Sequence, residues 1–229
     1  MTTTREPVGV VASGGHRVPR VLFRLPGVYR PQEDTRLLAS VAADYPAPFG
    51  TRVLDLCTGT GALALAAATV GAGAVTAVDI SRSAVWSAKA NAWWHRLPVQ
   101  VHRMSFLDMA NRRFDLVLAN PPYVPARVDR DPRWDAGFDG RSLLDPLCDA
   151  APGLLTETGT MLLVHSAVSG VDATLDRLRS GGLRGDVVAR QRVPFGPVMR
   201  ARARSLEHAG LIEPGTRHED LVVVRASRA

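Results

Sequence analysis

The fold of this 229-residue chain follows from the stretch RVLDLCTGTG, residues 52–61. The first five residues are mostly apolar and predict a short buried strand, and the glycines predict a turn that opens an alanine-rich helix at residues 62–68. Glycine at positions 59 and 61 lets the backbone pass close to a ligand that lies over the N-terminus of this helix. The pattern predicts the first half of a nucleoside-binding βαβ unit.

Two acidic residues follow the next two predicted strands. Asp79 ends the apolar run 75–78, 18 residues after Gly61, and a carboxylate at this strand end can accept both hydroxyls of a ribose. Asp108 follows a strand predicted at 99–103, where it can accept from an adenine amino group. Each aspartate alone is more typical of a turn or cap, but acidic residues at successive strand ends indicate a nucleoside site.

Residues 59–64 also fit a loose dinucleotide fingerprint, so both NAD and S-adenosylmethionine are candidate ligands. Asp55, four residues before Gly59, favours S-adenosylmethionine, because a carboxylate there suits the ammonium of a methionine tail and would repel a pyrophosphate. Asp108 and the lack of a separate substrate domain point the same way.

A second motif, Asn120-Pro121-Pro122-Tyr123, follows the apolar run 114–119. The two prolines stiffen the turn and donate no backbone hydrogen bonds. A planar NH2 group can donate to the Asn120 side-chain oxygen and the Pro121 carbonyl while Tyr123 stacks on its face. These contacts would aim the nitrogen lone pair at an electrophile, which indicates methyl transfer onto nitrogen. The alternative is an ordinary Pro-Pro turn with a half-buried tyrosine.

Together these motifs resemble the class I S-adenosylmethionine-dependent methyltransferases and, within them, the HemK-type glutamine methyltransferases that modify release factors. The resemblance rests on residues 55–61, 83–92, 120–123 and 27–35, the last resembling the start of the compact archaeal and eukaryotic branch. It implies an α/β, Rossmann-like fold whose seven-stranded, mostly parallel sheet has an antiparallel last strand and helices on both faces. We expect no room for the N-terminal helical domain of the bacterial enzymes.

The resemblance also implies the site. The catalytic residues are expected to be Asn120, Pro121, Pro122 and Tyr123. The residues expected at S-adenosylmethionine, with S-adenosylhomocysteine as product, are Tyr29, Asp34, Thr35, Asp55, Cys57, Thr58, Gly59, Gly61, Asp79, Ile80, Phe106, Leu107, Asp108 and Asn120. Asp55 and the glycines would hold the methionine side, Asp79 the ribose and Asp108 the adenine. Plain helix capping is the alternative role for Tyr29, Asp34 and Thr35.

Composition agrees with one enzyme domain over residues 1–229. The net charge of +6 comes from arginine, with Lys89 the only lysine, and favours an acidic or RNA-containing partner without separating protein from nucleic-acid substrates. The two cysteines, Cys57 and Cys148, show no metal-ligand spacing, so we expect free thiols and no metal. With no long apolar run or signal peptide, we expect a soluble, cytoplasmic protein without membrane contact.

Three further segments carry expectations. An N-terminal arm, residues 1–30, is expected to be irregular or to form a short hairpin with candidate strands at 8–11 and 18–25. Residues 124–140 form a loop that faces the acceptor as a lid or partner site, or else a solvated loop. Residues 194–218 form an insertion between strands six and seven, with an arginine-rich helix near 198–208 that rims the active site, Arg200 and Arg204 on one face and Arg202 turned away.

We therefore expect an S-adenosylmethionine-dependent N-methyltransferase acting on a glutamine amide of a protein such as a translation release factor, with an accessory subunit possible. Three alternatives stay open: a methyltransferase for adenine or guanine amino groups of nucleic acid, a small-molecule N-methyltransferase, and a non-catalytic nucleoside-binding scaffold. The sequence shows no target-recognition domain, which argues against nucleic acid. A scaffold would have no need of Asn120.

Overall fold

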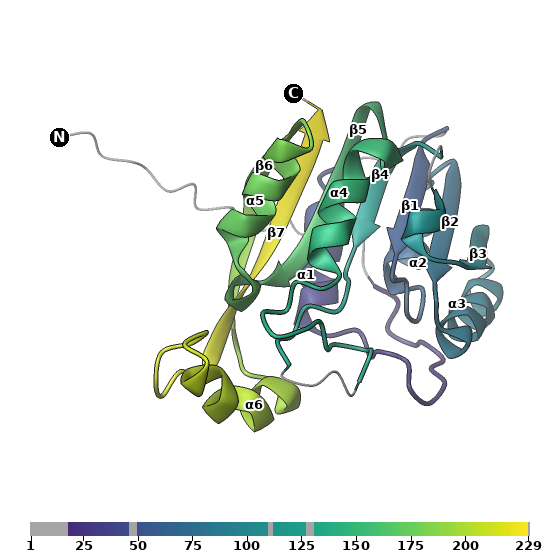
Figure 1. Cartoon of the computed structure of the whole chain (residues 1–229). Coiled ribbons are helices and arrows are strands. Elements are labelled where there is room, and N and C mark those ends of the chain that lie inside the picture. Colours follow the sequence, from purple (N-terminus) through teal and green to yellow (C-terminus); the bar gives the residue numbers. More distant parts are fainter. Residues whose placement is uncertain (1–17, 46–49, 110–111, 127–130, 229) are drawn as a thin grey trace.

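The computed structural model of the chain describes residues 18–45, 50–109, 112–126 and 131–228. Within them, seven strands form one sheet in the order β3-β2-β1-β4-β5-β7-β6 (Figure 1). The strands are β1 (Arg52–Leu56), β2 (Ala74–Asp79), β3 (Val99–Arg103), β4 (Phe114–Ala119), β5 (Leu155–Ser166), β6 (Leu183–Pro194) and β7 (His218–Arg228). The candidate strand at 8–11 lies outside the described residues.

The sheet is parallel from β3 to β5, whereas β7 runs antiparallel to both β5 and β6. β6 therefore ends at the same edge as the parallel strands, and β7 starts there. This arrangement confirms the predicted Rossmann-like fold with an antiparallel last strand. It also places β1 between β2 and β4, so that the chain crosses over in opposite directions from β1, and open α/β sheets bind ligands at such a switch point.

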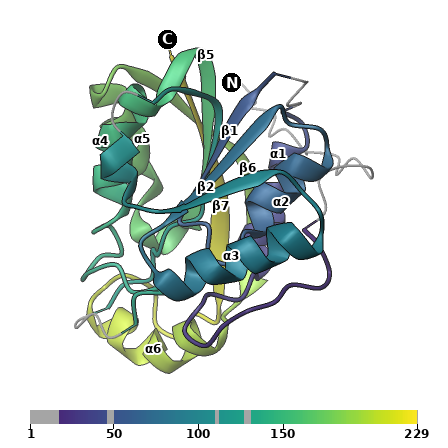
Figure 2. The same ribbon diagram turned by 90° about the vertical axis from the view of Figure 1, so that its right-hand side faces the viewer.

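Helices cover both faces of the sheet, as predicted (Figure 2). One face carries α1 (Glu33–Ala42), α2 (Ala62–Thr69) and α3 (Arg82–Trp94), and the other carries α4 (Leu144–Leu154) and α5 (Val171–Ser180). Successive strand residues point to opposite faces, so Val53 packs with the first set of helices and Leu54 with the second. The result is a three-layer core. α6 (Pro197–His208) lies apart from these layers, beyond the ends of β6 and β7 (Figure 1).

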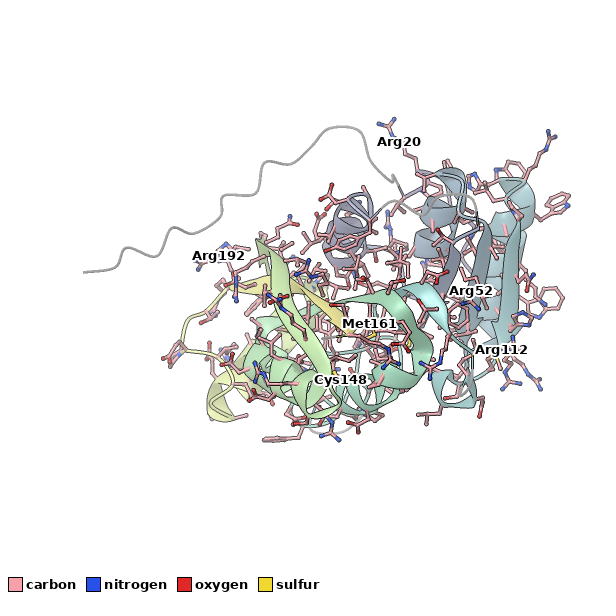
Figure 3. All side chains as sticks on the ribbon, turned by 90° about the horizontal axis from the view of Figure 1, so that it is seen from above. Arg20, Arg52, Arg112, Cys148, Met161 and Arg192 are labelled. Atoms are coloured by element: carbon pink, nitrogen blue, oxygen red, sulfur yellow. The ribbon has the colours of Figure 1, made fainter. Side chains whose placement is uncertain are left out.

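Most charged side chains of the described residues lie at the surface, although Asp34, Asp55, Asp135 and Arg141 are buried. Figure 3 shows the arginines that it labels, Arg20, Arg52, Arg112 and Arg192, at the periphery of the molecule, and all four are exposed. Cys148 of α4 is buried in the core and Cys57 is partly exposed, and both are free thiols. Among the described helices, none has the length and apolar character needed to cross a membrane.

The strand predicted at residues 18–25 is wrong. This segment is extended but pairs with no strand, and it lies along α3 instead. The Phe23 amide donates to Asn91 Oδ1 at 2.6 Å, the Asn91 amide returns a bond to the Phe23 carbonyl at 2.9 Å, and the Leu25 amide donates to Ser87 Oγ at 3.1 Å. Polar side chains of the helix satisfy this backbone, so it needs no partner strand.

The last two strands are longer than their apolar runs suggested. The apolar run at 221–224 is much shorter than β7, and β6 and β7 pair from Leu183 with Arg228 to Pro194 with His218. The apolar residues form only the buried middle of β7. Backbone hydrogen bonds continue the pairing of β6 with β7 into the less buried residues on either side.

Candidate active site

A cavity of about 930 Å³ lies at the carboxyl edge of the parallel strands. Most of the residues predicted for the site line it, although they come from four separate segments of the chain. Those at the cavity are Tyr29, Asp34, Thr35, Cys57, Thr58, Gly59, Asp79, Ile80, Asn120, Pro121, Pro122 and Tyr123. The structure therefore brings the glycine loop and the Asn-Pro-Pro-Tyr motif to one crevice.

The glycine loop is tied to the end of β2 by Asp79. The Gly59 amide donates to Asp79 Oδ2 and the Ser81 amide to Oδ1, both at 2.9 Å. Burial raises the pKa of Asp79, and these backbone bonds oppose the rise. Gly59 and Gly61 have φ of 55° and 83°, a region that glycine adopts without strain, and Cys57 has φ of 55° as a non-glycine residue. The loop is thus held in one shape beside the Asp79 carboxylate.

Asp55 lies beneath this loop and does not line the cavity. Its Oδ2 accepts from the Thr58 hydroxyl and from the Ala64 amide at 3.0 Å in the first turn of α2, and Oδ1 is buried without a hydrogen-bond partner in the described structure. Burial raises the pKa of Asp55 to about 7. The contacts that the structure shows for Asp55 shape the loop from below.

The acceptor side is organised by Asp34 at the start of α1, whose side chain is only 4% exposed. The hydroxyls of Tyr29 and Tyr123 donate to Asp34 Oδ2 at 2.8 and 3.1 Å. The Thr35 amide and hydroxyl donate to Oδ1 at 2.6 and 3.2 Å. Burial, together with the Asp34 charge, raises the pKa of both tyrosines above the ordinary tyrosine value, so both hydroxyls stay protonated donors.

This network fixes the orientation of the Asn120 amide. The Thr35 hydroxyl gives its proton to Asp34, so its oxygen serves as an acceptor, and Asn120 Nδ2 donates to it at 3.2 Å. Asn120 is therefore held with its nitrogen toward Thr35. Its Oδ1 has no hydrogen-bond donor among the described residues. A carbonyl oxygen at the cavity is what an incoming NH2 group needs.

The Tyr123 backbone is anchored from the opposite side. Ser169 Oγ donates to the Tyr123 carbonyl at 2.7 Å. Gly140 lies against the same carbonyl, so closely that an added Cβ would stand 2.3 Å from the Tyr123 oxygen and 2.8 Å from Ser169 Oγ. Gly140 has φ of 79°, which also favours glycine. Its position explains why the loop after the motif carries a glycine here.

The loop after Tyr123 folds back onto itself and is tied to α6. The Val124 amide donates to the Trp134 carbonyl at 2.7 Å, and the Ala136 amide donates to the Val124 carbonyl at 3.1 Å. Arg202 of α6 forms an ion pair with the buried Asp135 and donates to the Pro125 carbonyl at 3.1 Å. Arg202 thus ties α6 to the loop without lining the cavity, whereas Arg200 is exposed, lines the cavity and donates to the Phe195 carbonyl at 2.8 Å.

Trp134 lines the cavity and is half-buried, with the Arg133 guanidinium 4.1 Å from the centre of its ring. Phe138 is 60% exposed and does not line the cavity. One of the two aromatic side chains of this loop therefore contributes to the site, and the other faces solvent.

Besides Asp55, four predicted cofactor residues do not line the cavity, among them Gly61 at the N-terminus of α2. Phe106, Leu107 and Asp108 belong to the short 3-10 helix η1 (Phe106–Met109) and do not line it. Leu107 is 59% exposed, and Asp108 Oδ2 accepts from the Ser105 amide at 3.2 Å, which caps its own turn. Of the two roles expected for this aspartate, adenine binding and turn capping, the structure shows turn capping.

The sequence analysis missed Glu219, which lines the cavity from the start of β7. Burial raises the pKa of its carboxyl, partly offset by a hydrogen bond from Ser166. The signal was available in principle. An acidic residue just before the last apolar run reaches the active-site edge once that strand is recognised as antiparallel.

The sheet order, the glycine loop over α2 and the cavity at the switch point define a class I methyltransferase. Residues 22–181 match the family described as the methyltransferase small domain. A Methanocaldococcus jannaschii protein provisionally named a protein N5-glutamine methyltransferase is 32% identical over 76% of this chain and 90% of its own length. The release factor glutamine methyltransferase of Mycolicibacterium smegmatis is also 32% identical, over 80% of this chain and 68% of its own.

The chain therefore belongs to the HemK-type, protein N5-glutamine methyltransferase family, and it is an S-adenosylmethionine-dependent methyltransferase. Among solved structures, the E. cuniculi Mtq2–Trm112 complex, responsible for methylation of the termination factor eRF1, has the same fold with a TM-score of 0.64. The alignment covers 89% of this chain and 99% of that one at 20% identity. Among the described residues, no cluster of His, Cys, Asp and Glu is placed to hold a metal ion.

We predict that Gly140→Ala lowers both stability and methyl transfer, because its Cβ would displace the Tyr123 carbonyl. Gly182→Ala is the matched control, since Gly182 has the same left-handed backbone at φ of 78° but nothing within 4 Å of the added Cβ. Urea unfolding should show Gly140→Ala less stable than the control by about 1–3 kcal/mol, the usual cost of overpacking. Equal stability and activity of the two variants would contradict the contact.

A second prediction concerns Arg202, which joins α6 to the loop that lines the cavity. Arg202→Ala should raise the acceptor KM several-fold with a smaller change in kcat, because the loop loses its tie while the reacting groups stay in place. Arg202→Lys should recover part of the loss, since lysine keeps the charge without the two-pronged contact. Arg204→Ala, on an exposed position of the same helix, is the control. A KM equal to the parent value in Arg202→Ala would exclude the role.

Proposed function

We propose that the chain methylates the side-chain amide nitrogen of a glutamine in a protein substrate of the release-factor type. The observation that carries the proposal is the oriented Asn120 amide, whose Nδ2 donates to Thr35 at 3.2 Å and whose Oδ1 is left for an NH2 donor. The proposal is supported by the two relatives named for glutamine methylation, which this chain matches at 32% identity.

In this proposal, the cofactor lies along the glycine loop, where Thr58 and Gly59 bring the backbone close, and Asp79 accepts the ribose hydroxyls. The residues fit that ligand, because Gly59 leaves open space where a Cβ would stand and Asp79 lines the cavity beside it. When bound, S-adenosylmethionine supplies an electrophilic methyl group on sulfur. Asp55 takes part indirectly, by shaping the loop. Phe106, Leu107 and Asp108 would reach the adenine only if η1 closed over it.

The acceptor glutamine would enter from the side of Tyr123 and Trp134. Its two amide hydrogens would be accepted by Asn120 Oδ1 and the Pro121 carbonyl, and its plane would rest on the Tyr123 ring. Holding both hydrogens in the amide plane turns the nitrogen lone pair toward the methyl group. The nitrogen would take the methyl group that the bound cofactor supplies, and the amide proton that it gives up would leave through Asn120 Oδ1 or the Pro121 carbonyl to water. Positioning of this kind can lower the reaction barrier by several kcal/mol, and by about 7–11 kcal/mol in the best cases.

A protein partner is part of the proposal. The E. cuniculi protein was solved as a complex with Trm112. We therefore propose measuring methyl transfer by this chain with and without a cell lysate, because the lysate can supply an accessory subunit.

The substrate class is tested by incubating the chain with labelled S-adenosylmethionine and lysate, and then treating parallel samples with protease or nuclease. Label released by protease alone supports a protein acceptor, and label released by nuclease alone would assign the activity to nucleic acid.

Binding and chemistry should separate in two variants. Asp79→Ala leaves ribose hydroxyls poorly paired, at about 1–3 kcal/mol, so cofactor affinity measured by calorimetry should fall roughly five- to 150-fold. Asn120→Ala should keep that affinity within a few-fold and lower turnover by a factor on the order of 10². Thr35→Val removes the hydroxyl that accepts from Asn120 Nδ2. Its turnover should lie between those of the parent and of Asn120→Ala. Unchanged turnover in Asn120→Ala at saturating acceptor would remove the basis of the proposal.

A further inference from the structure

The outer surface of α3 exposes aromatic rings to an unusual degree. Trp86, Trp93 and Trp94 are 66%, 79% and 68% exposed, and they are three of the four tryptophans in the chain. Large aromatic side chains are normally mostly buried, and contiguous exposure of this kind marks an interaction site. Figure 2 shows α3 on the outside of the molecule, with the sheet behind it.

Cations alternate with these rings along one line of the helix. At 100° per residue, Arg82, Trp86, Lys89 and Trp93 fall within an arc of about 60°. We refer to these four residues as the α3 stripe. Its length is about 16 Å, from the helical rise of 1.5 Å per residue. All four residues of the stripe are exposed.

The core does not need the rings of the stripe. The opposite side of α3 is buried, and small residues there, Ala84, Ala88 and Ala92, carry its packing on the sheet and on α2. Gly61, for example, approaches Ala88 so closely that an added Cβ would lie 3.2 Å from the Ala88 Cβ. Because the stripe faces solvent, its tryptophans can be replaced without opening a cavity.

The charge around the stripe has one sign. Residues 80–107 contain four arginine or lysine residues and no aspartate or glutamate. Two of the four, Arg82 and Lys89, belong to the stripe, while Arg96 just after α3 and Arg103 at the end of β3 are also exposed. No ion pair to any of these four cations occurs among the described residues. The surface is therefore complementary to a polyanion.

We propose that the α3 stripe binds a single-stranded polynucleotide, with bases stacked on Trp86 and Trp93 and phosphates beside Arg82 and Lys89. Alternating aromatic and cationic side chains are the arrangement that single-strand binding uses, because every base has a flat face and every linkage a negative charge. The surface is less suited to a membrane, since the cations lie between the rings, where an inserted helix would place apolar side chains.

The stripe begins at the rim of the cavity and runs away from it. Ser81 and Ala84, at the start of α3, line the cavity, whereas Trp93 lies at the far end of the helix. A strand bound along α3 would therefore lie beside the active site and leave the acceptor cleft free. This inference stands on the surface of α3 alone and holds whichever acceptor the enzyme methylates.

The test is binding of a labelled oligouridylate of about 12 nucleotides, within the site sizes known for such surfaces, measured by fluorescence anisotropy. The parent should bind at low salt and lose affinity steeply as salt rises. The double variant W86A/W93A should bind at least tenfold more weakly, and W86F/W93F should stay within a few-fold of the parent because phenylalanine still stacks. R82E/K89E should abolish binding, while R204E on α6 is the control for charge alone.

Thermal melting should confirm that the variants are folded, as expected for exposed positions. Methyl transfer to an acceptor supplied without RNA should be unchanged in W86A/W93A, because no stripe residue belongs to the catalytic set. The proposal is overturned if the parent does not bind the oligonucleotide at low salt, or if W86A/W93A binds as tightly as the parent. It is equally overturned if the rings instead mediate binding to anionic vesicles or self-association in sedimentation.

Discussion

The buried Asp34 carboxylate is the interaction on which the acceptor side depends. It accepts hydrogen bonds from the hydroxyls of Tyr29, Thr35 and Tyr123, and so joins the N-terminal segment to the motif that follows β4. Its oxygens accept from all three hydroxyls, so each of these hydroxyls points its proton toward Asp34. The hydrogen bonds therefore run in one direction, from Asn120 to Thr35 and from Thr35 to Asp34. The same carboxylate thus fixes both the position of the Tyr123 ring and the orientation of the Asn120 side-chain amide.

In the proposed reaction, this constraint would let the site work without a charged base at the acceptor. An amide nitrogen is a weak nucleophile, and the groups that we propose to contact it are an amide oxygen, a carbonyl and a ring. Their value lies in position, because a preorganised acceptor costs no rearrangement when the reaction occurs. Anchors on several sides serve that purpose: Ser169 and Gly140 behind the Tyr123 carbonyl, and Arg202 on the loop beyond it.

The parts that could be predicted are those in which a short stretch of chain carries its own signal. The glycine turn after β1, Asp79 at the end of β2 and Asn120 at the end of β4 all follow apolar runs, and the parallel sheet brings them together. The fold followed from the same signals. Asp108 caps its own turn and does not line the cavity, which is the alternative that the sequence left open for each aspartate alone.

The parts that could not be predicted depend on tertiary contacts. Residues 18–25 looked like a strand, but Ser87 and Asn91 of α3 take its backbone groups. Helical spacing turned Arg202 away from Arg200, which lines the cavity, but it could not show that Arg202 forms an ion pair with Asp135. In each case the deciding partner is remote in sequence.

The most direct measurement of the central claim is tandem mass spectrometry of a purified release factor after incubation with this chain and S-adenosylmethionine. The account predicts one added methyl group on the side-chain nitrogen of a glutamine. Methyl groups found instead on a carboxylate, on another side chain or on a nucleic-acid base would contradict it, because an Asn120 oxygen held toward the cavity selects a planar NH2 donor.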